Sequence, residues 1–292
     1  MIDMIETVLG ESSIEADQPS PPRDGLPKYA ALLAARHAAH GPELFQFLKR
    51  LWGGQELEAL DVACGDGFYT AAFDTLLGEK SRVTAVDVSP AFLDWAARRV
   101  ATAGRNSRVG FVRADAGCLP FPDGSFDLVW CAQSLISLPD AAAALREMRR
   151  VVRPGGLIGL LENDRLHEMQ LPWPVDLELA VRTAERRKET GGAQPEKRNA
   201  GRCLSELAGS SGLMPFRRMT LTVDRLAPLS PADARFVELY LKTLVERLAG
   251  LLEPAVDRDL RRLTLASSPG YLPASKSFWM TWSDMILLAT PE

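Results

Sequence analysis

The stretch Leu60-Asp-Val-Ala-Cys-Gly-Asp-Gly67 leads a short apolar segment directly into a glycine-rich turn. Glycines at this point let the backbone turn sharply and let a ligand approach the main chain. A helical pattern follows from Phe68 to Leu77, so the segment is predicted to be a strand, a loop and a helix. A plain tight turn would give the same local pattern, and the neighbouring segments therefore decide its meaning.

The same alternation of strand and helix continues along the chain. Further strands are predicted at residues 82–87, 108–114, 126–131 and 157–162, and helices at residues 90–103 and 141–152. Strands that alternate with helices of this length favour right-handed crossovers and a mostly parallel sheet. An open sheet of this kind binds its ligand beyond the carboxyl ends of its strands.

Composition excludes several classes of protein. Hydrophobic residues make up 46% and charged residues 25% of the 292-residue chain, as in soluble globular proteins. No apolar run approaches the roughly 20 residues of a membrane span, and the acidic N-terminus is unlike a secretory signal. The net charge of −4 argues against a nucleic-acid partner. Four separated cysteines are typical of reduced thiols without a zinc site, and we expect a cytoplasmic location.

Two acidic residues at later strand ends point to an adenosine-shaped ligand. Asp87 ends the second strand roughly 20 residues after Gly67, where a carboxylate can accept hydrogen bonds from ribose hydroxyls. Asp115 follows the third strand, where it can accept one from an adenine amino group. The glycine turn and both carboxylates are therefore expected to meet at one edge of the sheet.

The loop favours S-adenosylmethionine over a dinucleotide. A dinucleotide site has a third glycine for helix packing, and Thr70 occupies that position here. We expect the Asp66 carboxylate to repel a diphosphate but not a sulfonium. An NAD-dependent oxidoreductase is the alternative from a different class of enzyme.

On these residues the chain resembles the class I S-adenosylmethionine-dependent methyltransferases of the ubiquinone/menaquinone-biosynthesis-like (type 11) group. Besides the loop at residues 60–67, the matching segments are Val86-Asp-Val-Ser-Pro90, Ala114-Asp-Ala-Gly-Cys-Leu-Pro-Phe121, Asp123-Gly-Ser-Phe-Asp-Leu-Val129 and residues 147–156. The resemblance implies an α/β fold with a Rossmann-like sheet of seven mostly parallel strands, flanked by helices and capped by a helical lid built from insertions.

The expected organisation follows from this resemblance and from the composition of the flanking segments. It comprises a flexible tail (1–27), N-terminal cap helices divided at Gly41-Pro42 (28–54), the cofactor-binding core (55–162), a lid insertion (163–200), a core continuation (201–223), a helical substrate cap (224–276) and the last core strand (277–292).

The resemblance also implies which residues hold S-adenosylmethionine. They are Asp61, Ala63, Gly65, Gly67, Asp87, Val88, Asp115, Ala116, Cys131, Ala132 and Gln133. The chain departs from the family pattern at Ala63, where a glycine is usual, and at Asp66, where threonine or serine is usual. Residues 133–140 also lack the histidines that are common in the equivalent segment.

Candidates for catalysis and acceptor binding lie outside the shared core. A base is needed only if the acceptor must lose a proton, and His167, after the fifth strand, is the candidate; a surface histidine is the alternative. His37 and His40 lie one helical turn apart without a nearby carboxylate, so we expect no metal. Tyr29, Trp173, Tyr240 and Trp279 are predicted to line an acceptor pocket, with ordinary core packing as the alternative.

The sequence therefore predicts a methyltransferase that uses S-adenosylmethionine and releases S-adenosylhomocysteine. We expect O-methylation of a small, largely apolar or aromatic acceptor in natural-product biosynthesis. Transfer to carbon or nitrogen is the alternative reaction, and a non-catalytic nucleoside-binding protein is the alternative class. The acceptor is the expected partner, with no nucleic acid and no membrane span, and a homodimer is the assembly considered.

Overall fold

The computed structural model describes residues 25–103, 108–190 and 200–291. Nearly all of the predicted tail, and part of the predicted lid insertion, lie outside the described residues. In chain order the elements are α1 (Ala30–Trp52), β1 (Glu58–Val62), α2 (Phe68–Leu76), β2 (Arg82–Asp87), α3 (Pro90–Ala103), β3 (Val109–Arg113), β4 (Phe126–Ala132), α4 (Ala141–Val151), β5 (Val152–Glu162), β6 (Met169–Gln170), α5 (Val175–Thr190), α6 (Ala200–Ser210), β7 (Leu213–Leu226), α7 (Pro231–Leu248), α8 (Pro254–Thr264), a 3-10 turn (Leu272–Ala274) and β8 (Trp279–Pro291).

The strands of the described residues form a single sheet of eight strands. Its order is β3-β2-β1-β4-β5-β8, and β7 pairs with the other edge of β8. Strands β1 to β5 pair in parallel, whereas β8 runs antiparallel to both β5 and β7. The predicted α/β class with a mostly parallel sheet is confirmed. The additional strand is β6, a two-residue extension that pairs with β8.

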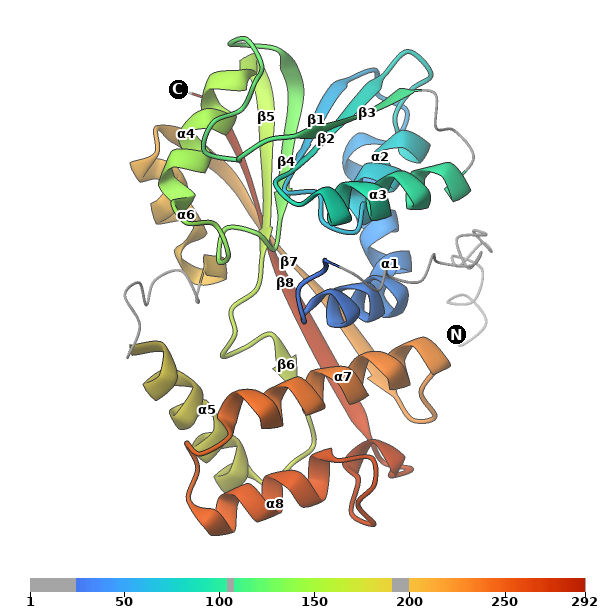
Figure 1. Cartoon of the computed structure of the whole chain (residues 1–292), viewed down its shortest axis with the longest axis vertical. Coiled ribbons are helices and arrows are strands. Elements are labelled where there is room, and N and C mark those ends of the chain that lie inside the picture. The colour runs from blue at the N-terminus through green and yellow to red at the C-terminus, as the bar shows by residue number, and fades with distance from the viewer. Residues whose placement is uncertain (1–24, 104–107, 191–199, 292) are drawn as a thin grey trace, which may run out of the picture.

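Helices cover both faces of this sheet, which explains why its strands are apolar on both sides. On one face, α1 and α2 contribute Leu48, Trp52 and Phe73 to a buried cluster. On the other face, α4 and α6 contribute Met148 and Leu204. The two layers are visible on either side of the upper sheet in Figure 1.

A second hydrophobic core lies below the sheet. Helices α5, α7 and α8 pack around one another there, and the long strands β7 and β8 run from the sheet into this lower part (Figure 1). Its buried side chains include Phe236, Leu244, Phe278 and Trp282, and α1 contributes Ala35. We refer to α5, α7 and α8 as the helical cap, and α1 and β8 join this cap to the sheet.

Helix α1 differs from its prediction because it is continuous. Gly41-Pro42 was expected to divide it, yet the helix runs unbroken from Ala30 to Trp52 with Pro42 inside. An internal proline removes one backbone hydrogen bond. Burial of Leu44 and Leu48 offsets that loss, and the missing Cβ of Gly41 leaves room for the Phe68 ring. Packing on both sides of the helix therefore outweighs the tendency of Gly41-Pro42 to break it.

None of the described helices is both long and apolar enough to cross a membrane.

Candidate functional site

A cavity of about 960 Å³ lies at the carboxyl ends of the parallel strands, between the sheet and the cap. The sheet side contributes residues from the carboxyl ends of β1 to β4 and from the loops that follow them, among them Asp61, Gly65, Asp87, Asp115 and Gln133. The cap side contributes residues from α1, α5, α7 and β8 and from the segment after β5. The cavity is where an open α/β sheet is expected to bind its ligand. We refer to the sheet side as the cofactor half and to the cap side as the acceptor half, after the ligands that the sequence predicts for them.

Asp87 ties two loops of the cofactor half together. Its side chain accepts hydrogen bonds from the backbone N–H of Gly65 at 3.1 Å and of Ser89 at 2.8 Å. Burial raises the pKa of this carboxyl group, and the two backbone N–H groups and that of Val88 oppose the rise. Asp87 lines the cavity, so a hydroxyl-bearing ligand can add further hydrogen bonds to a carboxylate that is already fixed in place.

The loop after β1 has left-handed backbone conformations, which allow a ligand to approach the main chain closely. Gly65 has a φ of 53°, and Ala63 has a φ of 56°, which is the left-handed region. Ala63 thus adopts a conformation that glycine reaches more readily than a residue with a side chain.

Asp61 offers an unpartnered oxygen to the cavity. One carboxylate oxygen accepts a 2.5 Å hydrogen bond from the Thr70 hydroxyl, and the other has no hydrogen-bond partner among the described residues. Burial raises the pKa of Asp61 to about 7, with smaller increases from Asp87 and Asp66. A positively charged group placed here would stabilise the ionised form. These features fit the amino and sulfonium groups of S-adenosylmethionine.

Gln133 lies in the loop after β4, and hydrogen bonds to Glu162 and Asn163 hold this loop in place. It has a φ of 52°, and its side-chain amide donates to Asn163 at 2.7 Å. Buried Glu162 accepts hydrogen bonds from the backbone N–H groups of Ser134 and Leu135 at 2.9 and 2.7 Å. Burial raises the pKa of Glu162 to about 8 despite these bonds. The loop therefore has a fixed shape where it borders the cavity.

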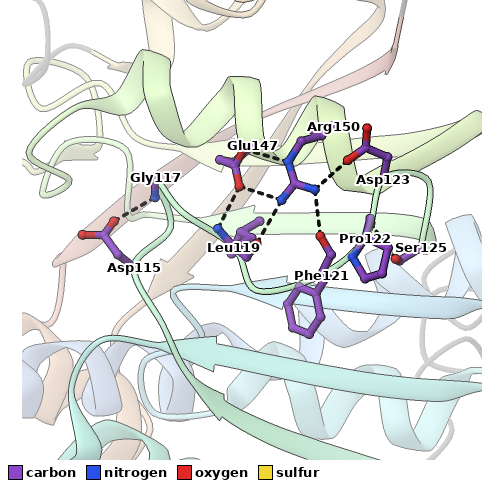
Figure 2. A network of polar contacts seen from close by, with 9 residues as sticks. All are labelled: Asp115, Gly117, Leu119, Phe121, Pro122, Asp123, Ser125, Glu147 and Arg150. Atoms are coloured by element: carbon purple, nitrogen blue, oxygen red, sulfur yellow. Dashed lines mark hydrogen bonds and ion pairs between the residues drawn. The ribbon is translucent and has the colours of Figure 1, made fainter.

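Asp115 begins the segment that connects β3 to β4, and this segment has no helix to hold it. Figure 2 shows that Arg150 and Glu147 of α4 do so instead. Arg150 donates to the carbonyl groups of Leu119 and Phe121 at 2.9 and 2.7 Å, and Glu147 accepts from the Leu119 N–H at 2.8 Å. Arg150 also contacts Glu147 twice at 2.8 Å, which lowers the pKa of that carboxyl group.

We expect Arg150→Met to weaken S-adenosylmethionine binding by about tenfold, the equivalent of one charge-assisted hydrogen bond, because the Asp115 segment loses its anchor. Calorimetry measures the effect. Arg146→Met is the matched control, since Arg146 is exposed one turn earlier on α4. Equal affinity in both variants would show that Arg150 does not position this segment.

The acceptor half combines aromatic rings with charged groups. Phe236, Tyr240 and Trp282 supply the rings. Buried Arg36 donates to Asp284 at 2.6 Å and lies 5.3 Å from the centre of the Trp282 ring. The charged and polar lining is completed by Asn163, Arg165, Glu168, Lys188 and Arg247. Arg36, Arg165, Glu168 and Phe236 carried no functional prediction from the sequence, because their importance depends on contacts between distant segments.

Most of the predicted cofactor residues line the cavity, but two do not. Those that do are Asp61, Ala63, Gly65, Asp87, Val88, Asp115, Ala116, Ala132 and Gln133. Gly67 instead allows close packing of α2 on α3, since a Cβ there would lie 2.5 Å from the Cα of Ala96. Cys131 is fully buried in the core of the sheet.

The predicted catalytic and acceptor residues are also divided. Tyr29 and Tyr240 line the cavity. Trp173 is 8% exposed within the core of the cap, and Trp279 is 37% exposed on the surface. His167 is exposed, with its backbone N–H bonded to the Asp164 carbonyl, and it is not among the lining residues.

Asp66 differs from its prediction as a charge that repels a diphosphate. Its carboxylate does not stand free toward a ligand, because it contacts His37 at 2.9 Å and Arg99 at 2.8 Å. It is therefore hydrogen-bonded by His37 of α1 and neutralised by Arg99 of α3, and it would not repel a diphosphate as an isolated charge. The choice of cofactor rests on other observations.

Residues 60–160 match the family model described as a methyltransferase domain. The ubiquinone/menaquinone biosynthesis C-methyltransferase UbiE of Shewanella oneidensis is 40% identical over 106 residues, which cover 36% of this chain and 42% of the relative. The same enzyme from Shewanella woodyi is 31% identical over 165 residues, 53% of this chain and 64% of the relative. The chain thus matches less than two thirds of the length of these curated relatives.

Solved structures share the fold over most of the chain. YjhP from E. coli aligns with a TM-score of 0.55 at 16% identity, and the alignment covers 91% of this chain and 100% of the YjhP chain. A methyltransferase from Thiobacillus denitrificans, solved with S-adenosyl-L-homocysteine, aligns with a TM-score of 0.53 at 14% identity. This alignment covers 91% of this chain and 99% of the Thiobacillus chain. Residues 60–160 are thus similar to a methyltransferase domain, and the chain shares the fold of these solved structures.

No group of three or more histidine, cysteine, aspartate or glutamate side chains in the described part of the chain is arranged to hold a metal ion.

Proposed function

We propose that this chain transfers a methyl group from S-adenosylmethionine to a small acceptor with an apolar or aromatic body, at a hydroxyl oxygen. The observation that carries this proposal is the continuity of the cavity, which joins the cofactor half to the acceptor half. Its volume of about 960 Å³ is at the upper end of the range for ligand pockets and suits a cofactor together with a small acceptor.

S-adenosylmethionine supplies a methyl group that its sulfonium already activates. The chain itself has to align the acceptor and exclude water. Helix α1 and the cap cover the carboxyl ends of the strands, and Tyr29, Tyr240 and Trp282 form part of this cover. A cover of this kind suits both tasks.

The lining of the acceptor half supports an acceptor with both a ring and polar substituents. Phe236 and Trp282 pack edge to face with ring centres 5.2 Å apart, and Tyr240 and Trp282 do so at 5.9 Å. Such walls suit an aromatic or apolar body. Asn163 and Glu168 offer polar groups that can orient it. We place the enzyme in the cytoplasm and in natural-product biosynthesis, without a nucleic-acid partner.

Methyl transfer to carbon is the second candidate. The relatives with matching cores are named C-methyltransferases, but the match covers the core and not the whole of the cap. The position of the new methyl group in the product, read by NMR spectroscopy, distinguishes transfer to oxygen, carbon and nitrogen.

The direct test measures binding and turnover together. We expect calorimetry to detect S-adenosylmethionine and S-adenosylhomocysteine but not NAD, and a panel of small phenols and aromatic alcohols to yield methylated products. Binding of NAD alone would overturn the proposal, and binding without turnover across the panel would favour a non-catalytic nucleoside-binding protein.

We expect Tyr240→Leu to raise the acceptor KM by tenfold or more, because truncating a buried aromatic contact costs about 2 kcal/mol of binding. The dissociation constant of S-adenosylmethionine should stay within a few-fold. Tyr271→Leu is the control, because Tyr271 is half-buried in the cap and is not among the residues that line the cavity. An unchanged KM in Tyr240→Leu would place the acceptor elsewhere.

A further inference from the structure

His37 is the histidine of α1 that lines the cavity, and it is held by a carboxylate. Its Nδ1 lies 2.9 Å from both carboxylate oxygens of Asp66. Asp66 is itself fixed by Arg99 at 2.8 Å and by the backbone N–H of Phe68 at 3.2 Å. Three separate elements therefore hold this pair in position.

The hydrogen-bond pattern sets the proton position on the His37 ring. An ionised Asp66 can only accept, so Nδ1 carries the hydrogen and Nε2 keeps its lone pair. Nε2 is buried and has no hydrogen-bond partner among the described residues. The ring stacks on Phe68 with centres 4.5 Å apart and meets the edge of Tyr69 at 5.5 Å. Its orientation is therefore fixed.

The surrounding charges keep the two partners in the required forms. Burial raises the pKa of Asp66, but Arg99 and the hydrogen bonds from His37 and from the Phe68 N–H outweigh burial and lower this pKa. Burial lowers the pKa of His37, and Arg36 and Arg99 lower it further, while Asp66 opposes them. An ionised carboxylate beside a neutral imidazole is the arrangement that a general base needs near neutral pH.

Two more titratable groups face His37. Neutral Tyr69 presents a buried hydroxyl without a described partner. His40 lies one turn along α1, and burial lowers its pKa well below the usual value, so it stays neutral. Neither group therefore adds a charge near His37 at neutral pH.

The position of His37 along α1 places it between the two halves of the cavity. Tyr29 precedes the helix and lines the cavity, and burial, with a smaller contribution from the Asp87 carboxylate, raises the pKa of its phenol. Further along, Arg36 reaches Asp284 and Trp282 in the acceptor half. His37 follows Arg36 and contacts the loop after β1 through Asp66, so it lies between the two halves of the cavity.

We propose that His37 is the general base of the reaction and that Asp66 is its positioning residue. This proposal rests on the proposed function and narrows the acceptor to one that carries a proton on its attacking atom, such as a phenol or an alcohol. As the acceptor oxygen forms its bond to the methyl carbon and the carbon–sulfur bond breaks toward sulfur, the O–H proton passes to Nε2. Asp66 stabilises the resulting imidazolium, which later releases the proton to solvent.

His37→Asn tests the proposal, because the asparagine amide can occupy the position of Nδ1 and keep the bond to Asp66 while Nε2 is removed. We expect kcat to fall by roughly 10²–10⁴-fold at neutral pH, the usual contribution of a general base. The dissociation constant of S-adenosylmethionine and the melting temperature should change little. His167→Asn is the matched control, since His167 is exposed, and it should match the parent enzyme.

The pH profile separates a base from a structural residue. In the parent enzyme, kcat/KM should rise with pH through an acid limb below 6.5, the ordinary histidine value, because the pKa of His37 is lowered. In His37→Asn this limb should vanish, and the rate should follow ionisation of the acceptor, about pH 10 for a phenol. An unchanged profile would overturn the assignment.

Nitrogen NMR gives a readout that does not depend on turnover. The chain has three histidines, and the signal lost in His37→Asn identifies His37. We expect a neutral ring with its proton on Nδ1 at pH 7. A proton on Nε2, or a cationic ring, would overturn the proposal even if methyl transfer occurs. A large loss of S-adenosylmethionine affinity in His37→Asn with kcat preserved would also overturn it, by making His37 a cofactor ligand. Failure of the proposed function would appear differently, as absence of turnover in the parent enzyme.

Discussion

Replacing Asp87 with alanine is expected to weaken S-adenosylmethionine binding by tenfold or more. The ribose would lose charge-assisted hydrogen bonds of about 1.5–3 kcal/mol each. The loop at Gly65 would lose its anchor as well, because the same carboxylate accepts that N–H at 3.1 Å. Both losses act on the cofactor half, so the fold should survive. Calorimetry on the folded variant measures the effect.

Asp94→Ala provides the matched control for this experiment. Asp94 is an exposed aspartate on α3, so its removal should leave the affinity unchanged. The Asp87 effect should also be smaller in Asp87→Asn, which keeps an oxygen acceptor. An Asp87→Ala variant with the dissociation constant of the parent protein would remove Asp87 from the cofactor site.

Replacing Arg36 with methionine is expected to destabilise the fold by about 3–5 kcal/mol, the usual cost of removing one partner of a buried ion pair. Arg36 and Asp284 are 4% and 0% exposed and lie 2.6 Å apart, and the pair joins α1 to β8. The variant leaves the Asp284 carboxylate buried without its cation. The melting temperature should fall by roughly 10 °C, given about 2–4 °C per kcal/mol for chains of this order of size.

Two further variants separate this effect from general damage to α1. Arg235→Met removes an exposed pair with Glu238 and should cost about 0–1 kcal/mol. Adding Asp284→Asn to Arg36→Met removes the stranded charge while keeping an acceptor for Asn163 and Trp282, so it should recover part of the stability. If the double variant is no more stable than Arg36→Met alone, the buried charge is not the cause.

The fold could be predicted because its signals are local. The strands β1, β2 and β4 are short apolar runs, and a helix follows each of them, so the βαβ order can be read directly. The strands β7 and β8 span residues 213–226 and 279–291, within or overlapping the core continuation expected at residues 201–223 and the last core strand expected at residues 277–292. Their extension into the cap could not be predicted, because it depends on pairing between distant segments.

The cofactor half was easier to predict than the acceptor half for a related reason. Its residues follow strand ends, and parallel strands bring their carboxyl ends together at one edge. The acceptor half is assembled from α1, α7 and β8, whose mutual packing has no local signature. Trp173 shows the consequence: its proline-flanked position suggested a pocket wall, whereas it packs inside the core of the cap.

Each residue of the His37–Asp66 pair stood out in the sequence, but their contact could not be predicted from it. Asp66 stood out as a departure from the family pattern, and His37 as one of three histidines in the chain. Their pairing joins a helix that precedes the sheet to the loop after its first strand. A single sequence does not reveal such a contact, and the unusual residue was therefore interpreted as a charge toward the ligand.

The most direct test of the account is a crystal structure with S-adenosylhomocysteine and a phenolic acceptor. We predict the ribose hydroxyls on Asp87, the adenine beside Asp115 and Ala116, and the acceptor oxygen within hydrogen-bond distance of the His37 Nε2, in the cavity these residues line. Density for the nucleoside at another site, or an acceptor bound outside this cavity, would contradict the account.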